Sequence, residues 1–383
     1  MTQSLFEDDH PDIASTLNNS AYLYYDKGEY TYAESLYQDA LAMYKRLFEG
    51  DHLDIASTLN NLARLYDDQW KYSVAEPFYQ DALAMRQRLF QGDHPDLASS
   101  LNSLASLNQN QGKYSLAEPL FQDALAMRQC LFEGDHPQVA SSLNNLALLY
   151  GYQGKYSLAE TLFQDALAMK QRLFEGDHPQ VASSLNNLAH LYYHQGKFSV
   201  AESLFKDALA LTQRLFEGDH LDIASSLSSL ALLYDSQGKY SAAESLYGEA
   251  LDMYQRLFKG DHPDMASSLS SLALLYYHQK KYSAAESLYK VTLNMYQRLF
   301  GSEHPCVADT LNDLASLYQS QGKYNAAEPL FQKALAIRER MLGGDPLDTM
   351  TIRESLIILQ HQRTPLFALK RWLTRLRQNL TSK

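Results

Sequence analysis

A unit of 42 residues is repeated along almost the whole chain without a single insertion. The dipeptide Asp-His marks seven copies of the unit, and one further histidine, His304, keeps the same register. The eight register histidines are His10, His52, His94, His136, His178, His220, His262 and His304. Eight units therefore fill residues 10–345 of the 383-residue chain. A period of this length predicts a stack of units that contact their neighbours, rather than a set of independent domains.

Each unit contains two apolar stripes with helical spacing. In the unit that begins at His136, Pro137 suits the first turn of a helix, and Asp135 or His136 can cap it. The first stripe follows at intervals of three and four residues: Val139, Leu143, Leu146, Ala147 and Tyr150. Gly154 supplies a turn, and a second stripe occupies residues 156–173. The unit is therefore predicted to be an antiparallel pair, a first helix and a longer second helix.

Eight residues of this unit resemble the signature of the tetratricopeptide repeat (TPR). They are Leu146, Ala147, Tyr150, Gly154, Tyr156, Ala159, Phe163 and Ala166. The 42-residue period and the HPxxA opening are similar to the TPR type of kinesin light chains, which is also common in bacterial, especially cyanobacterial, repeat proteins. The resemblance covers 336 residues. It implies an all-α fold, a right-handed α-solenoid of eight helix-turn-helix units whose first helices line a concave groove for peptides or partner proteins.

A few units depart from this pattern. Trp70 and Lys280 replace the turn glycine, Asn108 replaces the tyrosine at the position of Tyr150, and Thr292 replaces a small residue of the second helix. A redundant array should tolerate these changes, but we expect them to weaken repeats two, three and seven locally.

The two ends of the chain differ from the array. Residues 1–9 resemble the end of a preceding second helix, and residues 346–363 predict the first helix of a partial ninth unit. Thr364-Pro365 marks a boundary, because the residue before a proline disfavours helix. Residues 364–383 then predict a basic amphipathic helix. Its leucines at 366–380 could cap the last repeat, bind an anionic membrane surface or a partner, or dock on the acidic array.

Composition excludes several classes of function. The formal net charge of −12 makes phosphate neutralisation, and hence nucleic-acid binding, a poor hypothesis. Two cysteines cannot form a disulfide framework. No stretch approaches the ~20 apolar residues that span a bilayer, and the first residues lack the apolar core of a signal peptide. These features predict a cytoplasmic protein.

The sequence gives little support to catalysis or metal binding. The register histidines are best explained as helix caps. His190 and His194 have the i, i+4 spacing of metal ligands, but no acidic third ligand accompanies them in that helix. Phosphate-binding and nucleophile-elbow motifs are absent from the sequence. We therefore predict a non-catalytic protein without metal or cofactor.

The TPR resemblance assigns candidate binding residues to the first helices. We count positions from the alanine of the HPxxA opening; positions 2, 5, 9, 12 and 13 are expected on the concave face, with position 6 close by. The candidates are Asn60, Asn61, Arg64, Asn102, Asn144, Asn145, Leu148, Tyr152, Asn186, Asn187, His190, Tyr193, His194, Leu232, Leu274, Tyr277 and His278. The asparagines could hold the backbone of an extended peptide, or they could tie neighbouring helices together.

These residues predict a protein-interaction scaffold. Arg64 is the one permanent cation at positions 9, 12 and 13, so a clamp for acidic C-terminal tails is not expected. We expect a ligand that is neutral to basic and has apolar anchors, bound mainly by units four to seven. Two alternatives remain open: the regulatory arm of a larger signalling protein with a nucleotide-binding or protease-like domain, and an adaptor recruited to membranes by residues 366–380.

Overall fold

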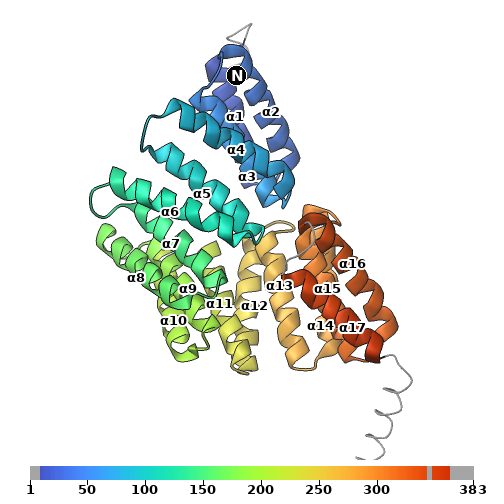
Figure 1. Cartoon of the computed structure of the whole chain (residues 1–383). Helices are drawn as coiled ribbons and strands as arrows, with labels where there is room; N and C mark the ends of the chain where they lie inside the picture. The colour runs from blue at the N-terminus through green and yellow to red at the C-terminus, as the bar shows by residue number, and fades with distance from the viewer. Residues whose placement is uncertain (1–8, 343–346, 363–383) are drawn as a thin grey trace, which may run out of the picture. The chain divides into compact units, whose positions relative to one another are not determined.

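The computed structural model describes residues 9–342 and 347–362. Within these ranges it contains 17 α-helices and no strands, which confirms the all-α prediction (Figure 1). The predicted helical remnant before Asp9 and the predicted basic helix 364–383 lie outside the described residues. The helices are α1 (Pro11–Asp26), α2 (Tyr30–Leu47), α3 (Leu53–Asp68), α4 (Tyr72–Leu89), α5 (Pro95–Asn110), α6 (Tyr114–Leu131), α7 (Pro137–Tyr152), α8 (Tyr156–Leu173), α9 (Pro179–His194), α10 (Phe198–Leu215), α11 (Leu221–Ser236), α12 (Tyr240–Leu257), α13 (Pro263–His278), α14 (Tyr282–Phe300), α15 (Pro305–Ser320), α16 (Tyr324–Leu342) and α17 (Leu347–Gln362).

Each first helix, odd-numbered from α1 to α15, begins at a register histidine. The Nδ1 atom of His136, for example, accepts a hydrogen bond at 3.2 Å from the backbone N–H of Gln138. The same bond recurs at the other seven register histidines, with distances of 3.2–3.3 Å between Nδ1 and the backbone nitrogen. This confirms that the histidines cap helices. From His52 onward, the phenylalanine four residues earlier stacks on the imidazole, as Phe132 does on His136 at 3.5 Å between ring centroids.

A tight turn joins the two helices of each pair. Gly154 adopts a φ of +72° there, in the left-handed region that suits glycine. Trp70 and Lys280 take a φ of +60° at the equivalent position, where a side chain is strained. Thr292 is fully buried in α14, and its Oγ1 has no hydrogen-bond partner among the described residues. In repeat three, Asn108 is buried and donates a hydrogen bond at 2.9 Å to the carbonyl oxygen of Leu104. The local weakening of repeats two, three and seven stays a prediction.

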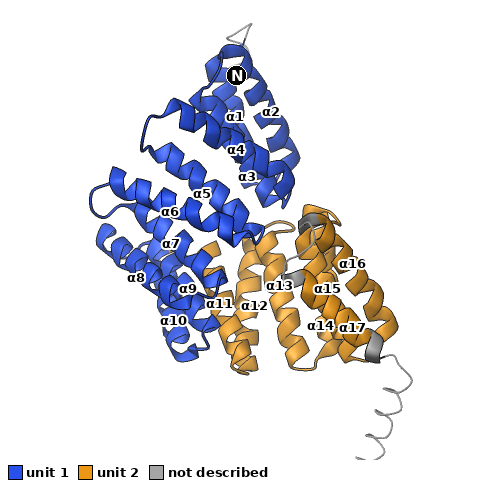
Figure 2. Cartoon of the chain, viewed as in Figure 1, with its two compact units in different colours: residues 1–215 blue, residues 216–383 orange. Residues whose placement is uncertain are grey.

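The chain divides into two compact units, residues 1–215 and 216–383 (Figure 2). Unit 1 contains α1–α10, and unit 2 contains α11–α17. Within each unit every helix packs on the next one along the chain, and successive first helices also contact one another. Second helices do not contact one another to that extent in the described residues. First helices therefore form the inner face of each stack, as expected for a solenoid.

Small and large side chains alternate in the core. In α8, Ala159 and Ala166 have no exposed surface, and Phe163 between them is 2% exposed. The alanines let the paired helices approach closely, and the aromatic ring fills the space beside them. In unit 2, Ile352 and Leu359 of α17 are buried in a cluster with Phe331 of α16, so that α17 packs on the last helix pair.

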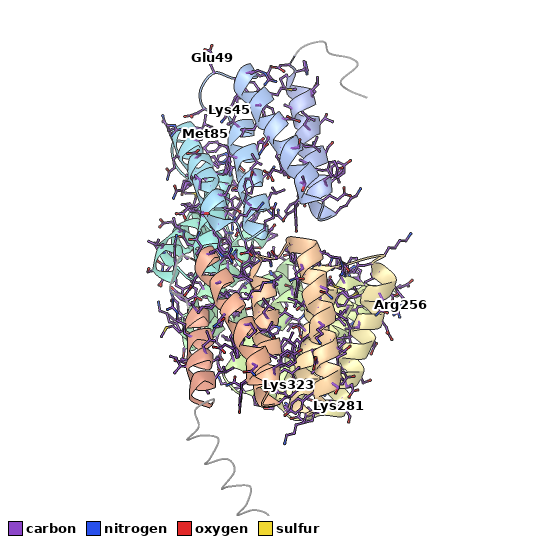
Figure 3. All side chains as sticks on the ribbon, turned by 90° about the vertical axis from the view of Figure 1, so that its right-hand side faces the viewer. Lys45, Glu49, Met85, Arg256, Lys281 and Lys323 are labelled. Carbon is purple, nitrogen blue, oxygen red and sulfur yellow. The ribbon has the colours of Figure 1, made fainter. Side chains whose placement is uncertain are left out.

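Charged pairs tie each repeat to the one before it. Lys281 and Lys323, which lie at the same end of the unit 2 helices in Figure 3, pair with Glu244 and Glu286 of the preceding repeats. These pairs are largely exposed to solvent, so each contributes ~0–1 kcal/mol. Their value lies in fixing the register of one repeat on the next.

Candidate functional site

A row of amides crosses the inner face of unit 1 at positions 5 and 6. Asn145 Nδ2 donates a hydrogen bond at 2.9 Å to Asn102 Oδ1 in the preceding repeat. Asn187 donates in the same way to Asn144 at 2.9 Å, and Asn61 donates to Asn18 at 3.3 Å. One of the two sequence-based interpretations, that the asparagines tie neighbouring helices together, is therefore confirmed for these pairs. An asparagine amide has two N–H donors and two acceptor lone pairs, so one bond to a neighbouring repeat uses only one of these four sites.

The same asparagines remain partly accessible. Asn102, Asn144, Asn145, Asn186 and Asn187 are all half-buried, and so are Asn60 and Asn61. A half-buried amide held by a neighbour has a fixed orientation and little side-chain entropy left to lose. Asn61, Asn102, Asn144, Asn145 and Asn187 therefore present preorganised donors and acceptors to anything that lies across the first helices, whereas the Oδ1 atoms of Asn60 and Asn186 are buried.

A second row of contacts joins position 12 of one repeat to position 13 of the next. In unit 1, Asn110 Nδ2 donates at 3.2 Å to Asp67 Oδ1, and the Tyr25 hydroxyl donates to Asp68. In unit 2, the Tyr277 hydroxyl and Ser320 Oγ lie 2.8 Å apart. The candidate residue Tyr277 thus has a structural contact that the sequence did not indicate.

His278 belongs to the same row in unit 2. Its Nδ1 lies 3.0 Å from each carboxylate oxygen of Asp235, which is 5% exposed. The imidazole itself is exposed. Asp235 was not among the predicted site residues, although it stands at position 12.

The histidines of α9 differ from each other in their surroundings. The ring of His190 packs edge-on against Phe205 at 4.9 Å, and burial lowers the pKa of His190 to about 4. His190 is therefore neutral at pH 7. His194 is exposed and packs against Tyr193, with 5.2 Å between ring centroids. His190 and His194 do not form part of a cluster of three potential metal ligands within the described residues.

The other candidates provide apolar and aromatic surface. Tyr152 is 62% exposed and stacks on Tyr114 at 6.3 Å, and Leu148 beside it is half-buried. In unit 2, Leu232 and Leu274 are half-buried at the same position 9. Arg64 extends over the ring of Tyr25 at 5.0 Å, a cation–π contact that partly occupies this cation.

Two carboxyl groups that the sequence did not single out have a raised pKa. Burial raises the pKa of Asp67 to about 6. Burial and the nearby Asp309 raise the pKa of Asp313 to about 7. The signal for Asp313 was present, because position 6 carries an asparagine or serine in the other repeats.

The predicted residues divide between the two units. Those from Asn60 to His194 lie in unit 1, whereas Leu232, Leu274, Tyr277 and His278 lie in unit 2, so the structure presents them as two sets. A separate cavity of about 360 Å³ lies between α8, α9 and α10, lined by Phe174, Val181 and Leu211 among others. None of the predicted residues lines that cavity. Among the described residues no helix is long and apolar enough to cross a membrane.

Solved structures with a similar fold include a Rap protein complexed with competence and sporulation factor. It is 15% identical, with a TM-score of 0.53, and the match covers 86% of this chain and 98% of the other. A tetratricopeptide repeat protein from Parabacteroides merdae is 18% identical, with a TM-score of 0.50, over 76% of this chain and 98% of the other. A Podospora anserina protein described as a kinesin light chain with nearly identical TPR-like repeats is 24% identical, with a TM-score of 0.44, over 54% of this chain and 98% of the other.

The family comparison covers the array. No curated protein matches the chain. The family model "Tetratricopeptide repeat" matches residues 12–88, 71–130, 96–172, 138–214, 180–256, 244–298 and 264–340, which together include every complete helix pair. The register histidines, the alanine-rich core and this match lead to one conclusion: the chain belongs to the tetratricopeptide-repeat family.

Proposed function

We propose that this protein-interaction scaffold binds an extended peptide segment of a partner protein across its first helices. The observation that carries the proposal is the row of half-buried amides of Asn102, Asn144, Asn145 and Asn187, each of which contacts a neighbouring repeat through one of its donor or acceptor sites and has more than one of each. Such a row can bind peptide backbone whatever the side chains. The Rap protein of similar fold, complexed with competence and sporulation factor, supports ligand binding by this architecture.

Selectivity comes from apolar side chains of the first helices. Tyr152 and Leu148 lie beside the amide row of unit 1 and offer contact surface for anchors of the ligand, and Leu232 and Leu274 offer such surface within unit 2. The chain carries a net charge of −12, which favours a ligand that is neutral to basic as a whole. The protein acts without catalysis: it provides a preorganised surface, so that little ordering of its own side chains opposes binding.

The test is a peptide-display selection on the full chain and on two matched variants. The groove variant combines Asn144→Ala, Asn186→Ala and Tyr193→Ala. The control variant carries three alanines at exposed second-helix positions of the same unit, Tyr156, Leu158 and Val200. Peptides enriched on the native chain should be lost on the groove variant, by roughly tenfold or more in affinity, and retained on the control.

Thermal unfolding of both variants controls for loss of structure. Equal enrichment on all three proteins, with all three folded, would contradict the proposal. The outer surface of the second helices would then be the better hypothesis for the binding site.

A further inference from the structure

One position of the second helix is buried in every repeat but varies in chemistry. It lies 34 residues after the register histidine, and its occupants are Tyr44, Arg86, Arg128, Lys170, Thr212, Tyr254, Tyr296 and Arg338. All eight are less than 9% exposed. Three successive repeats of unit 1 thus place a cation at a position that is otherwise filled by neutral side chains or, in repeat eight, by Arg338.

The cations of unit 1 are surrounded by neutral oxygen atoms. Arg128, 7% exposed, donates from Nη1 to Ser142 Oγ at 2.6 Å and from Nη2 to Ser99 Oγ at 3.3 Å. Arg86, 6% exposed, makes the same contacts with Ser100 at 2.6 Å and Ser57 at 3.1 Å. The Nε atoms of both arginines are buried and have no hydrogen-bond partner among the described residues.

A buried guanidinium without an anion is costly. Removing a charge from water is offset only when a counter-charge and complete hydrogen bonding replace the lost hydration. Arg86 is partly compensated, because the charge of Asp96 opposes the lowering of the Arg86 pKa by burial. Arg128 faces Gln138 at the equivalent place, and burial lowers the pKa of Arg128 with no opposing carboxylate.

In repeat eight, a carboxylate of the first helix pairs with the buried cation of the second helix. Position 2 of the first helix is serine in the other seven repeats, but it is Asp309 in repeat eight. Asp309 Oδ1 pairs with Arg338 Nη2, the same guanidinium nitrogen that reaches Ser57 and Ser99 in repeats two and three. The sequence separation is 29 residues in all three cases.

The Asp309 side chain is 56% exposed while it contacts a guanidinium that is 8% exposed. In repeat eight, a carboxylate with an exposed side chain therefore contacts the buried cation. Repeats two and three have the hydroxyl of a serine at position 2, where repeat eight has the carboxylate of Asp309.

We propose that Arg86–Ser57 and Arg128–Ser99 form two anion sites on the inner face of unit 1, which receive acidic side chains of the bound peptide. The proposal rests on the peptide binding proposed above, and it specifies the ligand. Arg128 is the stronger site, since no carboxylate of the chain faces it. A peptide that is neutral overall satisfies both proposals when basic residues flank its acidic ones.

The repeat sets the spacing of the acidic residues. Packed helices lie ~8–10 Å apart. A peptide in the extended polyproline II conformation advances ~3.1 Å per residue and makes one turn every three residues, so side chains three positions apart lie on one face, ~9 Å apart. Acidic residues three positions apart therefore match successive first helices.

The probe is a labelled nine-residue peptide of zero net charge, with two glutamates three positions apart and a lysine at each end. Its control has glutamine in place of both glutamates and is therefore cationic. The bulk charge of this acidic protein favours the cationic control. The anion sites predict the reverse: tighter binding of the glutamate peptide to the full chain, by roughly tenfold.

Variants of the full chain locate the effect. Ser99→Asp reproduces the arrangement of repeat eight and should remove the larger part of the preference for glutamate, since only the weaker Arg86–Ser57 site remains, and Arg128→Met should do the same. Ser183→Asp is the matched control, because it changes position 2 of repeat five, where Thr212 replaces the cation. Ser183→Asp should leave the preference unchanged.

The outcomes separate the two proposals. If selected peptides bind the first helices but glutamate and glutamine probes bind alike, the anion sites are wrong and peptide binding stands. Equal loss of preference in Ser99→Asp and Ser183→Asp would also overturn the sites, because a general charge effect would explain it. If selection finds no peptide that depends on the first helices, the proposed function itself fails.

Discussion

At the scale of single residues, the sequence predicted the roles of side chains better than the partners that they contact. The register histidines were identified as helix caps because they stand directly before the first helix of each unit, six of them before a proline, and His136 performs this role. The amides of Asn102 and Asn145 were placed on the right helices, but a hydrogen bond between repeats depends on distances that one repeat does not reveal. Arg128 was overlooked because a cation in the last turn of a helix normally faces solvent. Comparison with Tyr44 and Thr212 in the same register could have indicated its burial.

Asp313 should make stability depend on pH. Its pKa of about 7 in the folded state exceeds the ordinary value of 3.8, so the folded state binds the extra proton. This stability is present in full below pH ~4 and is lost as the pH rises through ~7. Asp313→Asn should stabilise the protein at pH 8 by about 1–2 kcal/mol and flatten the dependence between pH 4 and 7.

Urea unfolding across this pH range measures the effect. Asp81→Asn, which changes an exposed carboxylate of α4, is the control and should follow the native curve. An Asp313→Asn protein with the native pH dependence would show that the carboxyl group is not responsible.

At the scale of the helix pair, nearly all of the structure could be predicted from the sequence. Helical periodicity, the prolines and the turn glycines together predicted every pair, since local signals and the repeat agree. The turn positions of Trp70 and Lys280 were predicted as weak points because only glycine adopts a positive φ without strain. Packing of α17 on α16 depends on contacts between Ile352 and Phe331, which no local signal specifies.

The turn of repeat seven is expected to respond to a single substitution. Lys280→Gly should raise the free energy of unfolding by about 1 kcal/mol, because it relieves a φ of +60° at a residue with a side chain. The reciprocal change, Gly154→Lys, should lower it by a similar amount in repeat four. Denaturant titration of both variants, with unchanged m-values, provides the measurement. A destabilised Lys280→Gly protein would show that the lysine side chain contributes more than its backbone costs.

At the scale of the whole molecule, the period of 42 residues predicted one uninterrupted array, and the family match confirms repeats along it. The division into units at residues 215 and 216 has no counterpart in the sequence, where spacing and motif continue unchanged. Which partner binds is likewise not encoded in the framework, because the residues that fold each repeat are nearly the same in all of them. Selectivity depends on a few positions, among them Tyr152 and Arg128.

The central claim is that ligands bind across the first helices. Photo-crosslinking tests it most directly: a peptide from the selection, with a photoreactive residue at successive positions, is irradiated with the full chain, and the attached residues are identified by mass spectrometry. The account predicts attachment to the odd-numbered helices, at or beside positions 5, 6, 9, 12 and 13. Attachment concentrated on the even-numbered helices would contradict it.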